Sequence, residues 1–196
     1  MAGPSCWGSR FYWRYPMMMV SAFPAVSSKE DIKKNGRAFG GILGRVLLLN
    51  RKPTSIRLFY IEFKIIKLNI SYKPSWIDKI LTANNRLKGQ NMSLIVDGTC
   101  GAAALIDSRP PVVRIEVDEN RIQYSDLTDD ELLLRARKTA TRILRRHIGG
   151  FPMIDLFSID SVFRPYWIVF YGDPKPGHKV RYIPVPADGC SSNRTF

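Results

Sequence analysis

The sequence predicts an α+β fold in which a mostly antiparallel sheet packs against one main amphipathic helix at residues 129–147. Segments with alternating apolar and polar residues recur along the chain, and this pattern is typical of strands with one buried face. Turn-forming pairs such as Asp97-Gly98 separate several of these segments, as in β-hairpins. Residues 129–147 combine apolar residues at helical spacing with start and stop signals, so we expect the main helix there.

The composition and the N-terminal segment define the expected domain organisation. The chain has 196 residues, of which 45% are hydrophobic and 24% are charged, and this composition is typical of globular proteins. Residues 1–53 mix glycine, proline, serine, aromatic and basic residues without a steady period. We therefore expect residues 1–53 to form a basic, aromatic-containing tail or loosely ordered segment, and residues 54–196 to form a single α+β domain.

Five predicted strand regions follow one another along residues 54–196. In the first region the apolar positions slip by one residue at Ile65-Ile66, which predicts a β-bulge or a break between two strands. Pro165 in the fourth region indicates an edge or a bend, because proline has no amide hydrogen to donate to a neighbouring strand. The regions span residues 56–72, 92–106, 112–124, 158–171 and 179–185.

The predicted helix has recognisable signals at both ends. Thr128, with Glu131 three residues later, forms a capping box, and Gly149-Gly150 ends the segment. One face is apolar and is expected to cover the sheet, through Leu133, Ala136, Ala140, Ile143, Leu144 and Ile148. The opposite face is basic and carries Arg135, Lys138, Arg142 and Arg145.

The two halves of the predicted domain, residues 54–124 and 125–196, look alike in outline. Each has a long strand, a basic loop and a returning strand that leads into an Asp-Gly pair, Asp97-Gly98 in one half and Asp188-Gly189 in the other. Two copies of such a strand-hairpin unit in one sheet would bury faces that neither copy could bury alone. The alternative is that any two aromatic-rich hairpins share this outline.

Residues 128–188 resemble a PepSY-like module, which has an amphipathic helix, a strand that ends in aromatic residues and a returning strand with a Val-Asp-x-x-x-Gly type turn. The stretch Val96-Asp97-Gly98-Thr99-Cys100-Gly101 matches that turn and extends the resemblance to residues 58–101, whereas Ala187-Asp188-Gly189-Cys190-Ser191-Ser192 lacks the closing glycine. The resemblance implies a small non-catalytic module, often near the cell envelope, that binds or restrains other proteins. It supplies no catalytic residues.

The net charge of +13 is concentrated in the first half of the chain, where residues 1–100 hold 16 Lys and Arg against 5 Asp and Glu, whereas residues 101–196 hold 14 against 12. Such an excess attracts acidic proteins or other anionic surfaces, because they offer dense negative charge. We therefore expect a binding or interaction module that engages an anionic or acidic macromolecular partner through its basic N-terminal half. The candidate binding residues in the predicted domain are Lys64, Lys67, Arg86, Lys88, Arg135, Lys138 and Arg142.

The N-terminal segment supports an alternative partner. Arg10, Trp13 and Arg14 place cations beside aromatic rings, a combination that suits nucleic acid. The same residues would also suit peripheral contact with a membrane surface, where tryptophan lies at headgroup depth and arginine meets anionic lipid. The plainer interpretation of this segment is a basic tail, and that of the helix face is a solvated surface.

The sequence shows no constellation typical of catalysis, cofactor binding or metal binding. The glycine-rich residues 36–44 fit neither phosphate-loop motif. His147 and His178 are the only histidines, and with three scattered cysteines they do not predict a metal site. We therefore expect no cofactor, no metal and a non-enzymatic role. The third functional class, a cysteine-dependent enzyme, would use Cys100 or Cys190.

The cysteines and the apolar runs bear on the compartment. An odd number of cysteines leaves one thiol unpaired within the chain, and a reducing compartment such as the cytoplasm is the simpler interpretation. Residues 10–28 resemble a poor secretory signal, with Pro16 and Pro24 bracketing its apolar part, so a secreted or envelope-associated location stays open. No apolar run approaches the roughly 18 residues of a membrane-spanning helix, and we expect no transmembrane segment.

Overall fold

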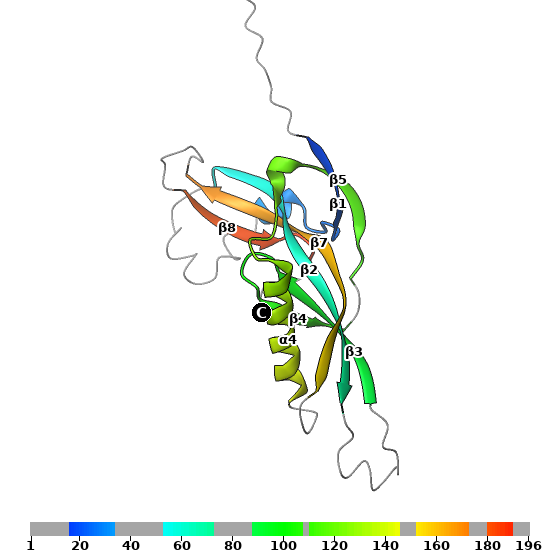
Figure 1. Cartoon of the computed structure of the whole chain (residues 1–196). Coiled ribbons are helices and arrows are strands. Elements are labelled where there is room, and N and C mark those ends of the chain that lie inside the picture. Colours follow the sequence, from blue (N-terminus) through cyan, green and yellow to red (C-terminus); the bar gives the residue numbers. More distant parts are fainter. Residues whose placement is uncertain are drawn as a thin grey trace, which may run out of the picture.

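The computed structural model describes residues 16–33, 53–72, 88–107, 110–145, 152–172 and 180–189. Within them, eight strands form one mixed sheet in the order β4-β3-β2-β7-β1-β5, with β6 paired to β2 and β8 paired to β7 (Figure 1). Residues 29–33 are also helical. The elements are β1 (Met17–Ala22), β2 (Ser55–Tyr72), β3 (Lys88–Asp97), β4 (Ala103–Ile106), β5 (Val113–Asp118), the 3-10 helix η1 (Glu119–Arg121), β6 (Ile122–Gln123), α4 (Asp129–Leu144), β7 (Met153–Tyr171) and β8 (Arg181–Pro186).

The predicted fold class, a mostly antiparallel sheet packed against one main helix, is wrong. Strands account for 56% of the described residues and helices for 19%, and the sheet is mixed because β1 pairs in parallel with β7 and β6 with β2. The physical reason is length. β2 has 18 residues and β7 has 19, so each extends over about 60 Å, whereas the 16 residues of α4 extend over about 24 Å. α4 therefore covers only one end of the sheet (Figure 1).

β2 and β7 pair along nearly their whole length and form the centre of the sheet. β2 continues through Ile65 and Ile66, where a bulge or break was predicted, and its pairing with β7 shifts register between Lys67 and Leu68 instead. These two adjacent isoleucines are 3% and 0% exposed. Because neighbouring residues of a strand point to opposite faces, both faces of the sheet are covered at this point.

The other predicted strands are present with shifted ends. The predicted hairpin at residues 92–106 is the β3–β4 pair, and the region at residues 112–124 contains β5, η1 and β6. The predicted helix begins at Asp129 as expected and ends at Leu144, with Arg145 as its C-cap, rather than running on to residue 147. Arg146 and His147 lie outside the described residues.

A second connection between β7 and β2 runs through β1, β5, η1 and β6. We call the closed path that it forms with the β2–β7 pair the ring. β1 pairs with β7 at Ala22↔Phe163 and with β5 along its whole length. After β5 the chain turns through η1, and β6 then pairs with β2 at Tyr60↔Ile122. The path from β2 through β7, β1, β5 and β6 therefore returns to β2. A buried cluster joins these strands through Val20, Ala22, Val117 and Phe163.

Part of the segment predicted to be a tail belongs to this ring. β1 lies within residues 1–53, and Ala22 and Phe23 are 0% and 5% exposed. The indole Nε1 of Trp167 donates a hydrogen bond to the Ser27 carbonyl at 3.0 Å, so the chain after β1 is also held against the sheet. Residues 1–15 and 34–52 lie outside the described residues.

Candidate binding surface

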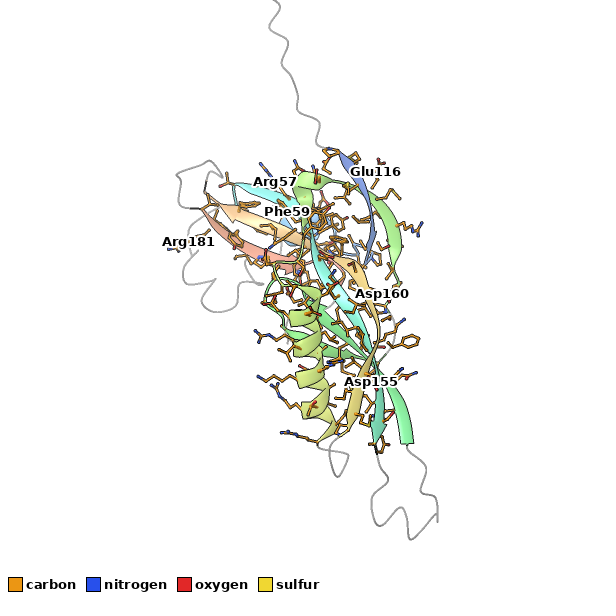
Figure 2. All side chains as sticks on the ribbon, viewed as in Figure 1. Arg57, Phe59, Glu116, Asp155, Asp160 and Arg181 are labelled. Carbon is orange, nitrogen blue, oxygen red and sulfur yellow. The ribbon has the colours of Figure 1, made fainter. Side chains whose placement is uncertain are left out.

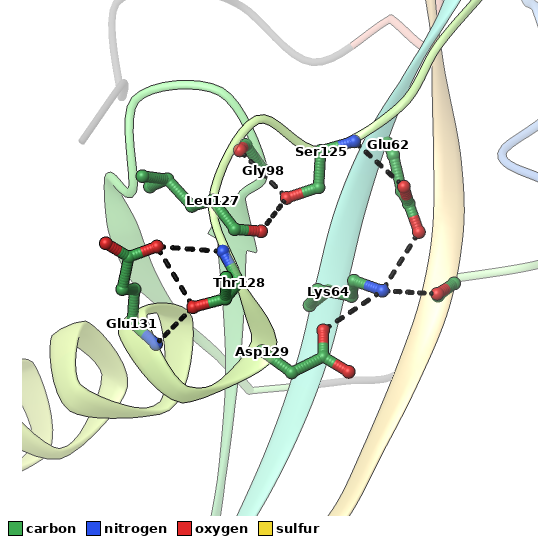
Figure 3. A network of polar contacts seen from close by, with 9 residues as sticks. Glu62, Lys64, Gly98, Ser125, Leu127, Thr128, Asp129 and Glu131 are labelled. Carbon is green, nitrogen blue, oxygen red and sulfur yellow. Dashed lines mark hydrogen bonds and ion pairs between the residues drawn. The ribbon is translucent and has the colours of Figure 1, made fainter.

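A polar network holds the start of α4 against β2 (Figure 3). Thr128 Oγ1 accepts a hydrogen bond from the Glu131 amide at 3.3 Å, and Glu131 Oε2 accepts one from the Thr128 amide at 2.9 Å, which confirms the predicted capping box. Just before the helix, Ser125 donates its amide to Glu62 Oε2 at 2.9 Å and its hydroxyl to the Gly98 carbonyl at 2.9 Å. The helix start is therefore tied both to β2 and to the turn after β3.

Lys64, one of the candidate binding residues, lies at the centre of this network (Figure 3). Its Nζ is 3.0 Å from Glu62 Oε1 and 3.2 Å from Asp129 Oδ1, and it donates a hydrogen bond to Ser161 Oγ at 2.8 Å. Burial by itself lowers the pKa of Lys64, but the hydrogen bonds and charges of the two carboxylates outweigh it and raise the pKa. The charge of Lys64 is already matched within the fold.

The same network shifts the pKa of Glu62 in the opposite direction. Burial by itself raises the pKa of this carboxyl, but hydrogen bonds from the Ser125 amide, Lys64 and Ser161 outweigh it and lower the pKa. Glu62 is 7% exposed, so its charge depends on these partners rather than on water.

The other candidate binding residues of the basic N-terminal half do not form one surface within the described part of the chain. Lys67 Nζ lies 3.7 Å from Asp160 Oδ2, so this cation also has a carboxylate beside it. Lys88 begins β3, and its side chain is not among those described. Four candidates lie outside the described residues: Arg86, Arg10, Trp13 and Arg14.

The candidates on α4 form an exposed basic face. Arg135, Lys138 and Arg142 are all exposed, as are the neighbouring Arg137 and Arg145. None of the ion pairs among the described residues involves these five side chains. From Arg135 to Arg145 the helix rises by about 15 Å. Figure 2 shows nitrogen-tipped side chains extending from α4 on the side away from the sheet.

The opposite face of α4 is buried, with a register slightly different from the prediction. Leu132, Ala136, Ala140 and Leu144 are buried against β2 and β3, while the predicted Leu133 and Ile143 only flank this cluster. The pattern of the segment fits both registers, because three leucines follow one another at residues 132–134. The third of them, Leu134, is 68% exposed and lies on the basic side of the helix.

A second charged group, which the sequence reasoning missed, is buried at the centre of β7. Arg164 is 6% exposed, and its Nε lies 2.6 Å from Asp188 Oδ2. Its guanidinium carbon is 5.8 Å from the centroid of the Phe63 ring and 5.3 Å from that of Tyr166, and burial raises the pKa of Tyr166 to about 12. The sequence feature that could have indicated this buried charge was an arginine in the middle of an aromatic-rich strand. Asp188, predicted to be a turn former, is its counter-charge.

The other predicted chemical groups are described only in part. Asp97 caps the turn after β3, because its Oδ1 accepts hydrogen bonds from the Thr99 amide at 2.8 Å and the Cys100 amide at 3.3 Å. Cys100 is exposed, whereas Cys190, His147 and His178 lie outside the described residues. In the described part of the chain, no three His, Cys, Asp or Glu residues come together as metal ligands could, and no helix there has the length and apolar character to cross a membrane.

Comparison with known proteins adds no relative. No protein-family profile, curated protein or solved structure matches this chain. The PepSY-like resemblance therefore rests on the quoted residues alone.

Proposed function

We propose that this protein is a non-catalytic binding module that engages an acidic protein through the basic face of α4. The observation that carries the proposal is the contrast between two sets of cations. Arg135, Lys138 and Arg142 are exposed and take part in no ion pair among the described residues, whereas Lys64 and Lys67 have carboxylates beside them. A basic face whose cations form no ion pair among the described residues is available to steer and hold an anionic partner.

An acidic protein segment fits this face better than nucleic acid does. Leu134 is 68% exposed and lies four residues before Lys138, so the two side chains are neighbours on the helix surface. An apolar side chain framed by cations suits a segment that offers both acidic and apolar groups. α4 carries no aromatic side chain on which a base could stack.

Fluorescence anisotropy with a labelled peptide of glutamate and leucine at helical spacing tests the proposal. The variant Arg135→Glu/Lys138→Glu/Arg142→Glu reverses the charge of the face. The matched control Lys29→Glu/Arg57→Glu/Arg114→Glu makes the same change of net charge at exposed positions elsewhere. We expect the wild type to bind less tightly as salt rises, the α4 variant to lose at least about 10-fold in affinity, and the control to stay within about 3-fold.

Two results would contradict the proposal. Equal losses in the α4 variant and in the control would show that net charge, rather than the helix face, attracts the peptide. Tighter binding of a single-stranded oligonucleotide, lost on Trp13→Ala, would favour the nucleic-acid alternative based on Arg10, Trp13 and Arg14.

A further inference from the structure

The regular part of the β2–β7 pairing, from Ser55↔Phe170 to Lys67↔Ser158, maps onto itself under a constant shift of 103 in residue number. Tyr60 pairs with Pro165, and Glu62 pairs with Phe163. Adding 103 to Tyr60 gives Phe163, and adding 103 to Glu62 gives Pro165, so the first pair becomes the second with its strands exchanged. A two-fold rotation has this property.

The outer strand of each hairpin follows the same relation. Phe63 pairs with Asp97 at the start of the β2–β3 ladder, and Tyr166 pairs with Pro186 at the start of the β7–β8 ladder. The shift from Phe63 to Tyr166 is again 103, and that from Asp97 to Pro186 is 89. The two hairpins therefore begin at equivalent positions of the two long strands.

The strands that precede each helix obey a shift of 100. Phe163 pairs in parallel with Ala22, and the equivalent Tyr60 pairs in parallel with Ile122. Within the β1–β5 ribbon, Met17↔Asp118 and Met18↔Val117 exchange under the same shift. The relation thus covers parallel as well as antiparallel pairs.

Single hydrogen bonds between distant loops repeat in the same way. The Gly98 amide donates to the Glu62 carbonyl at 3.1 Å, and the Ala187 amide donates to the Pro165 carbonyl at 2.9 Å. The carbonyl of Gly98 accepts from the amides of residues 126 and 127, and that of Ala187 accepts from the amides of residues 26 and 27. Gly98 and Ala187 differ by 89, Glu62 and Pro165 differ by 103, and residues 26 and 27 differ from residues 126 and 127 by 100. The three shifts therefore account for every one of these contacts.

The two helix starts are equivalent as well. Ser28 and Asp31 exchange the same reciprocal hydrogen bonds as Thr128 and Glu131. The residue after each acidic partner, Ile32 in one case and Leu132 in the other, is 2% and 0% exposed.

We infer that the chain contains two copies of one strand–helix–strand–strand unit, residues 17–98 and residues 117–187, related by a two-fold axis through the Ile61↔Arg164 pair. This unit differs from the predicted strand-hairpin halves, because it begins at β1 and because Gly98 is equivalent to Ala187, so the two Asp-Gly pairs do not coincide.

The two copies are intertwined. α4 belongs to the second copy, but it packs against Ile66 and Leu94 of the first. Ile32 belongs to the first copy, but it packs against Val169 and Val185 of the second. Each helix start therefore completes the core of the other copy's strand pair.

The copies have diverged at the axis. Phe63 and Tyr166 are equivalent under the shift of 103, and Arg164 lies between their rings. Ile61 takes the place of Arg164 in the first copy, and its side chain packs in the cluster that contains both rings. Two arginines there would face each other as buried like charges. The counter-charge Asp188 follows Ala187 directly, so its equivalent is Thr99, which follows Gly98.

Transposing the ion pair from one copy to the other in the full chain tests the inference. Arg164→Ile/Asp188→Thr removes the pair from the second copy, and Ile61→Arg/Thr99→Asp adds one to the first. We expect each double variant to lower the urea midpoint. The variant with all four changes should lower the midpoint by at least about 0.5 M less than the two separate losses added together. Additive losses would overturn the inference.

Hydrogen exchange of the wild-type chain provides a test that does not depend on any variant folding. The equivalent amides of Gly98 and Ala187, and those of Glu131 and Asp31, should be protected pairwise, because they make equivalent hydrogen bonds. Exchange at the rate of an unprotected amide by one member of each pair would overturn the two-fold relation.

Discussion

At the residue scale, charges that are typical of partner binding serve the fold instead. Lys64 lies between Glu62 and Asp129, and Arg164 is paired with Asp188 in the centre of β7. A buried charge without a partner costs several kcal/mol, so these pairs fix which strands and turns lie together. The exposed cations of α4 have no such role within the described residues.

Replacing Glu62 with glutamine is expected to lower the free energy of unfolding by about 1–3 kcal/mol near neutral pH, because Lys64 loses one of its two carboxylates. Folding lowers the pKa of Glu62, so its contribution is present above the ordinary value of 4.5 and is lost as pH falls through the lower folded value. Urea unfolding of wild type and variant at several pH values measures this difference.

The difference should be full near neutral pH and should vanish in acid. The control Glu119→Gln changes an exposed carboxylate and should alter the free energy of unfolding by less than about 0.5 kcal/mol. A difference between wild type and Glu62→Gln that stays constant down to acid pH would contradict the role given to this carboxylate.

At the scale of the element, the two faces of α4 have different roles, because one packs in the core and the other is exposed. Leu132 is 0% exposed and packs in the cluster formed with β2 and β3, whereas Leu134 is 68% exposed. The capping box and the network around Lys64 fix the rotation of the helix, so that one leucine is buried and the next but one is presented to solvent.

Leu132→Ala should destabilise the protein by about 2–5 kcal/mol, because it leaves a cavity in a packed core. Leu134→Ala should change the free energy of unfolding by less than about 0.5 kcal/mol, since that side chain loses little contact. Thermal or urea unfolding measures both variants. In the anisotropy assay, the Leu134 variant should instead bind the acidic peptide less tightly. Equal stability of the two variants would contradict the described register of α4.

At the scale of the whole molecule, the two copies cannot separate without exposing both cores. The ring through β2, β7, β1, β5 and β6 joins them, and α4 packs on the strand pair of the first copy. The molecule is therefore one cooperative unit built from two repeats, rather than two domains in series.

We accordingly expect a single unfolding transition in urea. Far-UV circular dichroism reports the sheet as a whole, and tryptophan fluorescence reports in part on Trp167, which packs against the cluster that contains Ile32 of the first copy. The two signals should give the same midpoint. Two separated transitions would show that the copies unfold independently.

The sequence alone determined the local features of this protein. The Thr128 and Glu131 capping box, the Asp97 turn and the period of the strands are formed by residues close together in the chain, so spacing and side-chain chemistry are sufficient to predict them. The basic face of α4 was visible for the same reason.

Only the tertiary structure decided how these pieces meet. The pairing of β2 with β7, the closure through β1 and β6, and the ion pair of Arg164 with Asp188 join residues that no local spacing relates. The same long-range pairing placed a carboxylate beside Lys64 and left Arg135, Lys138 and Arg142 exposed. Free energy from contacts between distant residues selects the partner of each strand, and an alternating pattern records only that a partner exists.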